Sequence, residues 1–466
     1  MVFNDLFFLF VFLPLALILF YVFPKKLRIV PMILTGLIFF SWGEPSYLVF
    51  PVFSVLFCWL TGLELELLKK QSRSCRGATA AATVVMLLIL GYFKYTGFLL
   101  GNINALTGLQ LRAAELALPI GISFYTFSAL SYVFDVAHDK VPAQHDPARL
   151  AAYLLFFPKL SSGPIVKYAA MVPQLEAPGA DLSLFGTGLR RFLVGLFKKV
   201  LLADSLGSLF SALSGQETLS AGCAWLGVLL YGLQLYYDFC GYSDMAIGLS
   251  GMFGFAFGKN FDYPYCSCSV GEFWNRWHIS LASWFKEYLY IPLGGSRCST
   301  AKTLRNILIV WLCTGIWHGA DWSFVLWGLY QCAFILLEKT LLRSFWDRVP
   351  KALRRLACGA VIMFAWPLFF SSSAAAAMEW YGRMFGSAGA GFFDGTFLYY
   401  LKSGFWLIVI GLIGLGPITD RIHTNLCYRK SGAAIPVSVL LYGVLTILSV
   451  ACVVGSTYSS FLYFQF

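Results

Sequence analysis

The chain has 466 residues, of which 59% are hydrophobic and only 12% are charged, and its mean hydropathy is +0.72. This composition excludes a soluble globular protein and indicates a polytopic membrane protein. The formal net charge of +11 does not indicate nucleic-acid binding, because the basic residues stand in short clusters between apolar runs. The positive-inside rule explains such clusters as cytoplasmic loops.

Apolar runs fill most of the sequence from residue 6 to residue 466. The sequence therefore predicts an all-α polytopic membrane protein, a single integral-membrane domain over residues 1–466. We expect about ten to twelve transmembrane helices, each of about 20 mostly apolar residues, with additional re-entrant and interfacial helices. The first run, residues 6–23, is followed by PKKLR rather than by a small-residue cleavage site, which predicts a retained helix and not a signal peptide.

The twelve cysteines lie mostly inside apolar runs and are interpreted as small packing residues, not as a disulfide framework. Cys266 and Cys268 form the one closely spaced pair. No second group of cysteine or histidine stands at metal-ligand spacing from them, so no metal site is predicted.

The segment FFPKLSSGPIVKY, residues 156–168, mixes apolar residues with two prolines, a glycine and two lysines. An uninterrupted spanning helix would tolerate this composition poorly. Two interpretations stay open. The segment is either re-entrant or interfacial and lines a cavity, or it is an ordinary loop at the membrane surface.

Two stretches further along carry charge within apolar surroundings. The pairs Arg190-Arg191 and Lys198-Lys199 recur about two helical turns apart, which predicts a basic amphipathic helix at the cytoplasmic surface. Such a helix would bind anionic lipid headgroups or attract an anionic donor such as a nucleotide thioester. Asp238 and Asp244 lie in a long apolar run, where an ionisable residue is costly and suggests function. Neighbouring tyrosines and Ser243 could equally satisfy these carboxylates structurally.

Two of the five histidines lie in tryptophan-rich segments. His278 belongs to EFWNRWHISLASWFKEYLYIPLGGSR and His318 to TGIWHGADW. At about 100° per residue, residues 272–291 form an amphipathic interfacial helix with His278 at the edge of its apolar arc. Asp321 suits a helix N-cap, which predicts that His318 stands at a break between two helices. The other three histidines have polar neighbours and are predicted to lie at the surface: His138, His145 and His423.

Burial keeps an imidazole neutral and leaves one nitrogen able to accept a proton. His318 is therefore the predicted general base and His278 the second catalytic candidate, which would bind or orient a substrate. The candidate substrate-binding residues are Asn275, Arg276, Trp277, Trp317, Asp238, Asp244 and Lys286.

The sequence resembles the membrane-bound O-acyltransferase family, and within it the bacterial alginate O-acetylase branch. The matching segments follow the family's order from the first residue to about residue 330, and residues 331–466 are expected to add further transmembrane helices. These segments are MVFNDLFFLFVFLP, LPIGISFYTFSALSYVFDV, FFPKLSSGPIVKY, YYDFCGYSDMAIG, NFDYPY, EFWNRWHISLASWFKEYLYIPLGG and GIWHGADWSFVLWGLY.

The resemblance implies a funnel of helices enclosing a passage through the bilayer, with the family's catalytic histidine at His318 and its second polar residue at His278. The branch moves acetyl groups to sugar hydroxyls of exported polysaccharides together with a separate extracytoplasmic acetyltransferase. The expected donor is acetyl-CoA, another acyl-CoA or an acyl carrier protein thioester, with no permanently bound cofactor. The expected location is the bacterial cytoplasmic membrane, among membrane lipids and without nucleic acid.

One departure and three alternatives accompany this resemblance. Residues 371–373 are serines where the branch usually carries an arginine. Transfer of D-alanine or another acyl group to teichoic acid or a partner protein is the first alternative, although YLYIPLGGSR favours the alginate-like branch. The second is a polysaccharide or proton-coupled transporter, against which no paired halves with broken helices are apparent. The third is a scaffold for a polysaccharide synthase.

Overall fold

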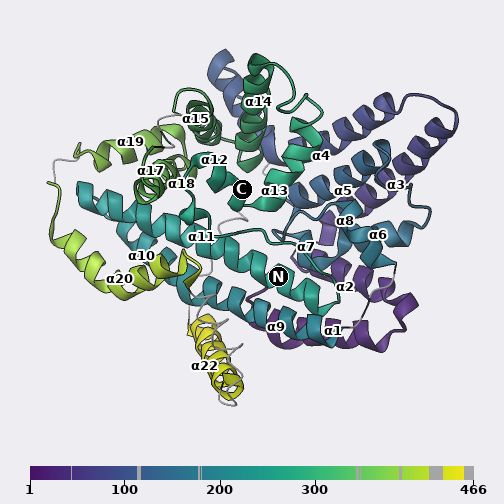
Figure 1. The fold of residues 1–466 in the computed structure, drawn as a ribbon, viewed down its shortest axis with the longest axis horizontal. Helices are drawn as coiled ribbons and strands as arrows, with labels where there is room; N and C mark the ends of the chain where they lie inside the picture. Colours follow the sequence, from purple (N-terminus) through teal and green to yellow (C-terminus); the bar gives the residue numbers. More distant parts are fainter. Residues whose placement is uncertain are drawn as a thin grey trace. The chain divides into compact units, whose positions relative to one another are not determined.

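The structure is a computed structural model that describes residues 1–43, 45–112, 117–176, 179, 181–342, 346, 348–387, 391–418 and 434–455. All regular secondary structure in these ranges is helical (Figure 1). The chain forms two compact units. The first contains Met1–Phe192, Ser243–Gly258 and Ser283–Leu289, and the second contains Leu193–Tyr242, Lys259–Ala282 and Tyr290–Phe466.

The first unit is built mainly from the N-terminal helices. Asp146 shows how its helices begin, because its side chain accepts a hydrogen bond from the Ala148 backbone N–H at the start of α6. The helices are α1 (Leu13–Val22), α2 (Ile29–Ser41), α3 (Val49–Lys70), α4 (Arg76–Thr107), α5 (Ile122–Ala137), α6 (Pro147–Leu155), α7 (Phe157–Leu160), α8 (Tyr168–Leu175) and the larger part of α9 (Leu182–Phe197).

The proline-containing segment after α6 is irregular and buried. α7 lasts for four residues, and Ser161 and Ser162 beyond it are 0% and 2% exposed. Lys159 is also buried, with its ammonium nitrogen 3.8 Å from the centre of the Tyr153 ring. Enclosure by protein argues against an ordinary loop at the surface, and the membrane depth of the segment and a cavity beside it stay predictions.

The second unit contains the two tryptophan-histidine segments. The long helix α11 (Ala221–Met252) enters it as far as Tyr242. The other helices are α10 (Asp204–Ser214), α12 (Val270–Arg276), the start of α13 (Ile279–Phe285), α14 (Thr300–His318), α15 (Trp322–Lys339), α17 (Lys351–Phe364), α18 (Trp366–Phe370), α19 (Ala374–Met384), α20 (Gly395–Gly414) and α22 (Ala434–Gly455).

Five helical segments in the described ranges are long and apolar enough to cross a membrane. Two shorter apolar helices, Phe8–Val22 and Ile122–Ala137, accompany them. The larger number of crossings expected from the sequence stays a prediction. The five segments are Pro45–Lys70, Arg76–Thr107, Lys351–Phe370, Gly395–Gly414 and Pro436–Gly455.

The prediction of a single interfacial helix over residues 272–291 is wrong. The structure has two short helices instead, α12 and α13, and His278 between them adopts a left-handed φ of +48°. A neighbouring segment supplies hydrogen bonds in place of the helical ones. The Ile279 N–H donates to the Asn260 carbonyl at 2.9 Å, and the Asp262 N–H donates to the Arg276 carbonyl at 3.0 Å. The apolar arc is still buried in the second unit at Phe273, Trp277 and Leu281.

Candidate active site

The α14–α15 pair places His318 at a helix end, as the sequence predicts. α14 ends at His318, and α15 begins at Trp322 with the Asp321 side chain accepting from the Ser323 N–H at 2.7 Å. The two helices pack closely (Figure 1). A Cβ added to Gly328 would lie 2.6 Å from the Trp311 carbonyl oxygen, so this approach requires glycine. The end of α14 is therefore held firmly in the unit.

His318 is enclosed by aromatic rings. Its side chain is 4% exposed, and its ring centre lies 5.0 Å from Trp317, 5.0 Å from Trp327 and 5.2 Å from Phe369. All three ring pairs meet edge to face. Such apolar surroundings disfavour the charged imidazolium and favour the neutral ring, which is the form that can accept a proton.

His278 also lies against Trp317. Its side chain is 3% exposed, as predicted from its place beside the apolar arc. Its ring centre is 4.7 Å from Phe239 on α11 and 6.0 Å from Trp317. Both imidazoles thus contact the same indole, and the fold brings together two histidines that are far apart in the sequence.

Asn260 fixes the orientation and tautomer of His278. The Ser280 N–H donates to Asn260 Oδ1 at 3.0 Å, which identifies that atom as the amide oxygen, and His278 Nδ1 lies 3.2 Å from it. An amide oxygen only accepts, so Nδ1 carries the hydrogen and the ring lone pair is on Nε2. Burial lowers the pKa of His278 to about 3. This histidine, which lies outside the candidate spans, is therefore a neutral hydrogen-bond acceptor at pH 7.

Two of the predicted substrate-binding residues belong to this aromatic core. Trp317 contacts both imidazoles, and Trp277 is 5% exposed and stacked on Phe273 with ring centres 5.5 Å apart. Asn275 points outward on α12 and is exposed. Arg276 forms an ion pair with Glu272 at 2.8 Å and lines a separate pocket.

The remaining candidates are held elsewhere. Asp238 is 1% exposed and forms an ion pair with Lys199 at 2.8 Å. In the first unit, Asp244 forms an ion pair with Arg191 at 2.9 Å, and Lys286 is exposed. Tyr237, one of the predicted donors to these carboxylates, instead donates its hydroxyl hydrogen to the Gly411 carbonyl.

The prediction of a basic helix at the surface is wrong at Lys199, which is buried. α9 passes into a π-helix over Lys198–Ala203, and Lys199 in that turn is 1% exposed. Its ammonium group contacts Asp204 at 2.6 Å as well as Asp238. Burial alone would lower the pKa of Lys199. The two neighbouring carboxylates outweigh this effect, so the pKa of Lys199 is raised. Arg190, by contrast, is exposed as predicted.

Four residues around the histidines were not predicted as site residues: Asn260, Phe239, Trp327 and Phe369. Asn260 begins NFDYPY and Trp327 lies in GIWHGADWSFVLWGLY, so both stood inside segments already noted for their resemblance. Phe239 directly follows Asp238. Phe369 gave no signal, because one phenylalanine among 44 carries little information.

The other three histidines and the serines at residues 371–373 are not part of the candidate site. His138 and His145 are exposed, which confirms their predicted surface location, and His145 contacts Glu66 at 2.9 Å. His423 lies outside the described residues. Ser373 caps α19, where its hydroxyl accepts from the Ala376 N–H at 3.2 Å.

Comparison with known proteins identifies the family. Residues 34–378, which include both tryptophan-histidine segments, match the sequence model of the membrane-bound O-acyltransferase family. The chain belongs to that family. The acyltransferase is 38% identical to the "Probable alginate O-acetylase" of Azotobacter vinelandii, over 83% of this chain and 78% of the relative. It is 31% identical to the "Peptidoglycan O-acetyltransferase" of Helicobacter pylori, over 81% and 79%.

A more distant likeness covers less of the sequence. The acyltransferase is 29% identical to the "Teichoic acid D-alanyltransferase" of Streptococcus thermophilus, over 48% of this chain and 58% of the relative. Family membership, the named acetyltransferase relatives and the apolar helices together make this protein an O-acyltransferase of the multi-pass membrane class.

Gly319 provides a test of how sharply the aromatic enclosure positions His318. A Cβ at Gly319 would lie 2.1 Å from the Phe324 ring, and Phe324 packs on Phe369 with ring centres 5.3 Å apart. We expect Gly319→Ala to displace these rings, to lower the acyl-transfer rate by about tenfold and to destabilise the protein by about 1–3 kcal/mol. The rate and the thermal unfolding of purified protein are the measurements.

The matched control is Gly359→Ala in α17, where an added Cβ meets nothing within 4 Å. That change should leave the rate unaltered and stabilise the helix by up to about 1 kcal/mol. Equal rates for the two variants would show that the enclosure tolerates displacement.

Proposed function

We propose that this acyltransferase moves an acetyl group from a thioester to a hydroxyl group of an exported or cell-surface polysaccharide. The observation that carries the proposal is the pair of buried imidazoles that both lie against Trp317. Support for the acceptor class comes from the relatives named for alginate and peptidoglycan acetylation, which align over most of the chain. The D-alanyltransferase likeness covers about half of it.

His318 acts as the general base in this proposal. Its neutral imidazole takes the proton of the acceptor hydroxyl while the hydroxyl oxygen attacks the thioester carbonyl. The new C–O bond forms, the C–S bond breaks, and the proton passes to the departing thiolate. A thioester is already activated, so general-base assistance of about 10²–10⁴-fold is sufficient help.

His278 orients the acceptor. Its hydrogen on Nδ1 is directed to Asn260, and its lone pair on Nε2 is suited to accept a hydrogen bond from a sugar hydroxyl. A pKa of about 3 makes His278 a weak base, which favours His318 for proton removal. The left-handed backbone at His278 is a strained conformation of the kind found at functional sites.

The proposal also includes the donor, the partner enzyme and the membrane in which the reaction takes place. Acetyl-CoA or an acyl carrier protein thioester reaches the site from the cytosol, and the acceptor enters from the outer side of a bacterial cytoplasmic membrane. A separate extracytoplasmic acetyltransferase would work together with this protein, as the resemblance to the branch implies. Because donor and acceptor come from opposite sides of the membrane, the reaction requires a passage between the two sides, which the resemblance to the family leads us to expect.

The test uses the purified full-length protein in detergent, where no transmembrane gradient exists. Labelled acetyl-CoA and a short uronic-acid or amino-sugar oligosaccharide are supplied, and labelled ester in the oligosaccharide is measured by mass spectrometry. Acceptor-dependent ester formation is the expected result. Thioester hydrolysis without ester in any acceptor would contradict the proposal. A complete lack of thioester-dependent modification under these conditions would favour a transporter.

A further inference from the structure

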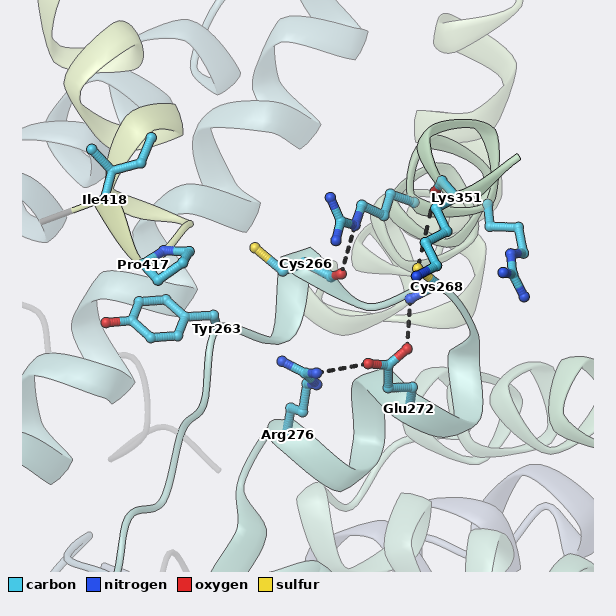
Figure 2. A pocket seen from close by; sticks show the side chains of 10 residues that line it. Tyr263, Cys266, Cys268, Glu272, Arg276, Lys351, Pro417 and Ile418 are labelled. Carbon is cyan, nitrogen blue, oxygen red and sulfur yellow. Dashed lines mark hydrogen bonds and ion pairs between the residues drawn. The ribbon is translucent and has the colours of Figure 1, made fainter. Parts of the chain in front are cut away.

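The second unit contains a basic pocket of about 650 Å³ that the acyl-transfer proposal does not use. Four cationic side chains line it, and one carboxylate accompanies them: Arg276, Lys351, Arg354, Arg355 and Glu272. Figure 2 shows the Cys266–Cys268 loop running between Lys351 and the Glu272 side of the pocket. The lining comes from α12, from the segment Tyr263–Cys268 that precedes it, from the start of α17, and from Pro417 and Ile418 after α20.

Among the residues that the structure describes, one carboxylate lines the pocket, and it is already engaged. Glu272 forms an ion pair with Arg276 at 2.8 Å and accepts the Cys268 backbone N–H at 2.8 Å (Figure 2). Glu272 offsets one of the four positive charges, so the described lining is basic on balance. A concave surface lined by one sign of charge concentrates ions of the opposite sign.

The position of the cations in α17 adds to this excess. Lys351, Arg354 and Arg355 occupy the beginning of the helix, where the helix dipole is also positive, and the first turn holds no acidic residue. Like charges in this arrangement repel one another unless an anion lies among them. Arg355 is already oriented, because its Nε–H donates to the Cys266 carbonyl at 3.1 Å.

We propose that this pocket binds a phosphate group. Guanidinium groups match phosphate oxygens in pairs and a lysine ammonium adds a mobile point charge, so the lining suits a tetrahedral dianion or a phosphodiester. α17 opens the candidate span Lys351–Phe370, and basic residues at the start of a span indicate the cytoplasmic side. Two sources of phosphate are present there: the headgroup of an anionic phospholipid and a soluble phosphate-bearing molecule.

The experiment measures both sources on the purified full chain. Inorganic pyrophosphate is titrated by calorimetry as the soluble probe, and retention of phosphatidylglycerol against phosphatidylcholine is measured by native mass spectrometry as the lipid probe. Lys351→Gln/Arg355→Gln should weaken binding of at least one probe by about tenfold. Both side chains are exposed, so the fold should survive, and thermal unfolding checks that it does. Lys351→Gln alone should give a smaller loss of the same kind.

The matched control is Lys302→Gln, an exposed lysine near the start of α14 that is not part of the pocket lining. It should leave both affinities unchanged. Selective loss of pyrophosphate binding assigns the pocket to a soluble phosphate, and selective loss of phosphatidylglycerol assigns it to lipid. Unchanged binding of both probes in the pocket variants, or an equal loss with Lys302→Gln, would overturn the proposal. Because the experiment measures binding and not acyl transfer, it tests the phosphate pocket independently of the proposed acyl-transfer function.

Discussion

Replacing His318 with alanine is expected to lower the rate of acyl transfer by about 10²–10⁴-fold, the usual contribution of a general base. The loss should appear in kcat with little change in the donor KM, because the imidazole acts on the acceptor proton in the transition state. The measurement is labelled ester formed from labelled acetyl-CoA and oligosaccharide by the purified variant.

A second variant separates chemistry from packing. His318 fits between Trp317, Trp327 and Phe369, so His318→Ala also leaves a cavity. His318→Phe keeps an aromatic ring in that space and removes the basic nitrogen, and it should be as inactive as the alanine variant while unfolding at a higher temperature. His138→Ala, at an exposed histidine, is the matched control and should retain full activity. Full turnover by His318→Phe would exclude the general-base role.

The two histidines differ in what the surrounding fold does to them. His278 has a defined hydrogen-bond partner in Asn260 and a backbone conformation that places it outside a helix. His318 ends a regular helix inside an aromatic enclosure. A residue held by a second polar group is suited to orienting a substrate, whereas a residue at the end of a helix is placed by that helix alone. The division of roles proposed for the reaction follows from these environments.

Local signals were sufficient to predict that His318 stands at a break between two helices. An N-cap aspartate and two apolar runs fix the break between α14 and α15, and neither depends on residues distant in the sequence. The break at His278 could not be found in this way. It depends on Asn260, which accepts hydrogen bonds from the backbone of Ile279 and Ser280, 19 and 20 positions away. A helical projection of residues 272–291 contains no information about such a partner.

The burial of Lys199 was also missed because it depends on a residue distant in the sequence. The Lys198-Lys199 pair has the periodicity of a surface helix, and only the return of α11 brings Asp238 against Lys199. One of the two carboxylate partners of Lys199 is close in the sequence, since Asp204 follows Lys199 by five residues. A π-helical turn between them places the two side chains in contact, and π-turns are not visible in a periodicity of 3.6.

Lys199→Met is expected to destabilise the protein by about 3–5 kcal/mol, because it leaves two buried carboxylates without their cation. Asp238 and Asp204 are 1% and 13% exposed in their side chains. Burial raises the pKa of Asp204 to about 6. A group whose folded-state pKa is raised binds its proton more tightly in the folded state, so stability rises as the pH falls. Lys199 lowers this pKa, so in the variant Asp204 takes up its proton at a higher pH than in the unaltered protein, and the deficit should shrink as the pH falls toward about 6.

Two further variants test the cause of that loss, with thermal unfolding measured across the same pH range. Lys199→Met/Asp238→Asn removes one orphaned charge and should recover part of the stability. Lys259→Met breaks an exposed pair with Asp262, in which the side chains are 66% and 44% exposed at 3.6 Å, and should change stability by less than about 1 kcal/mol. Similar losses for Lys199→Met and Lys259→Met, or a deficit independent of pH, would show that the buried triad does not carry this stability.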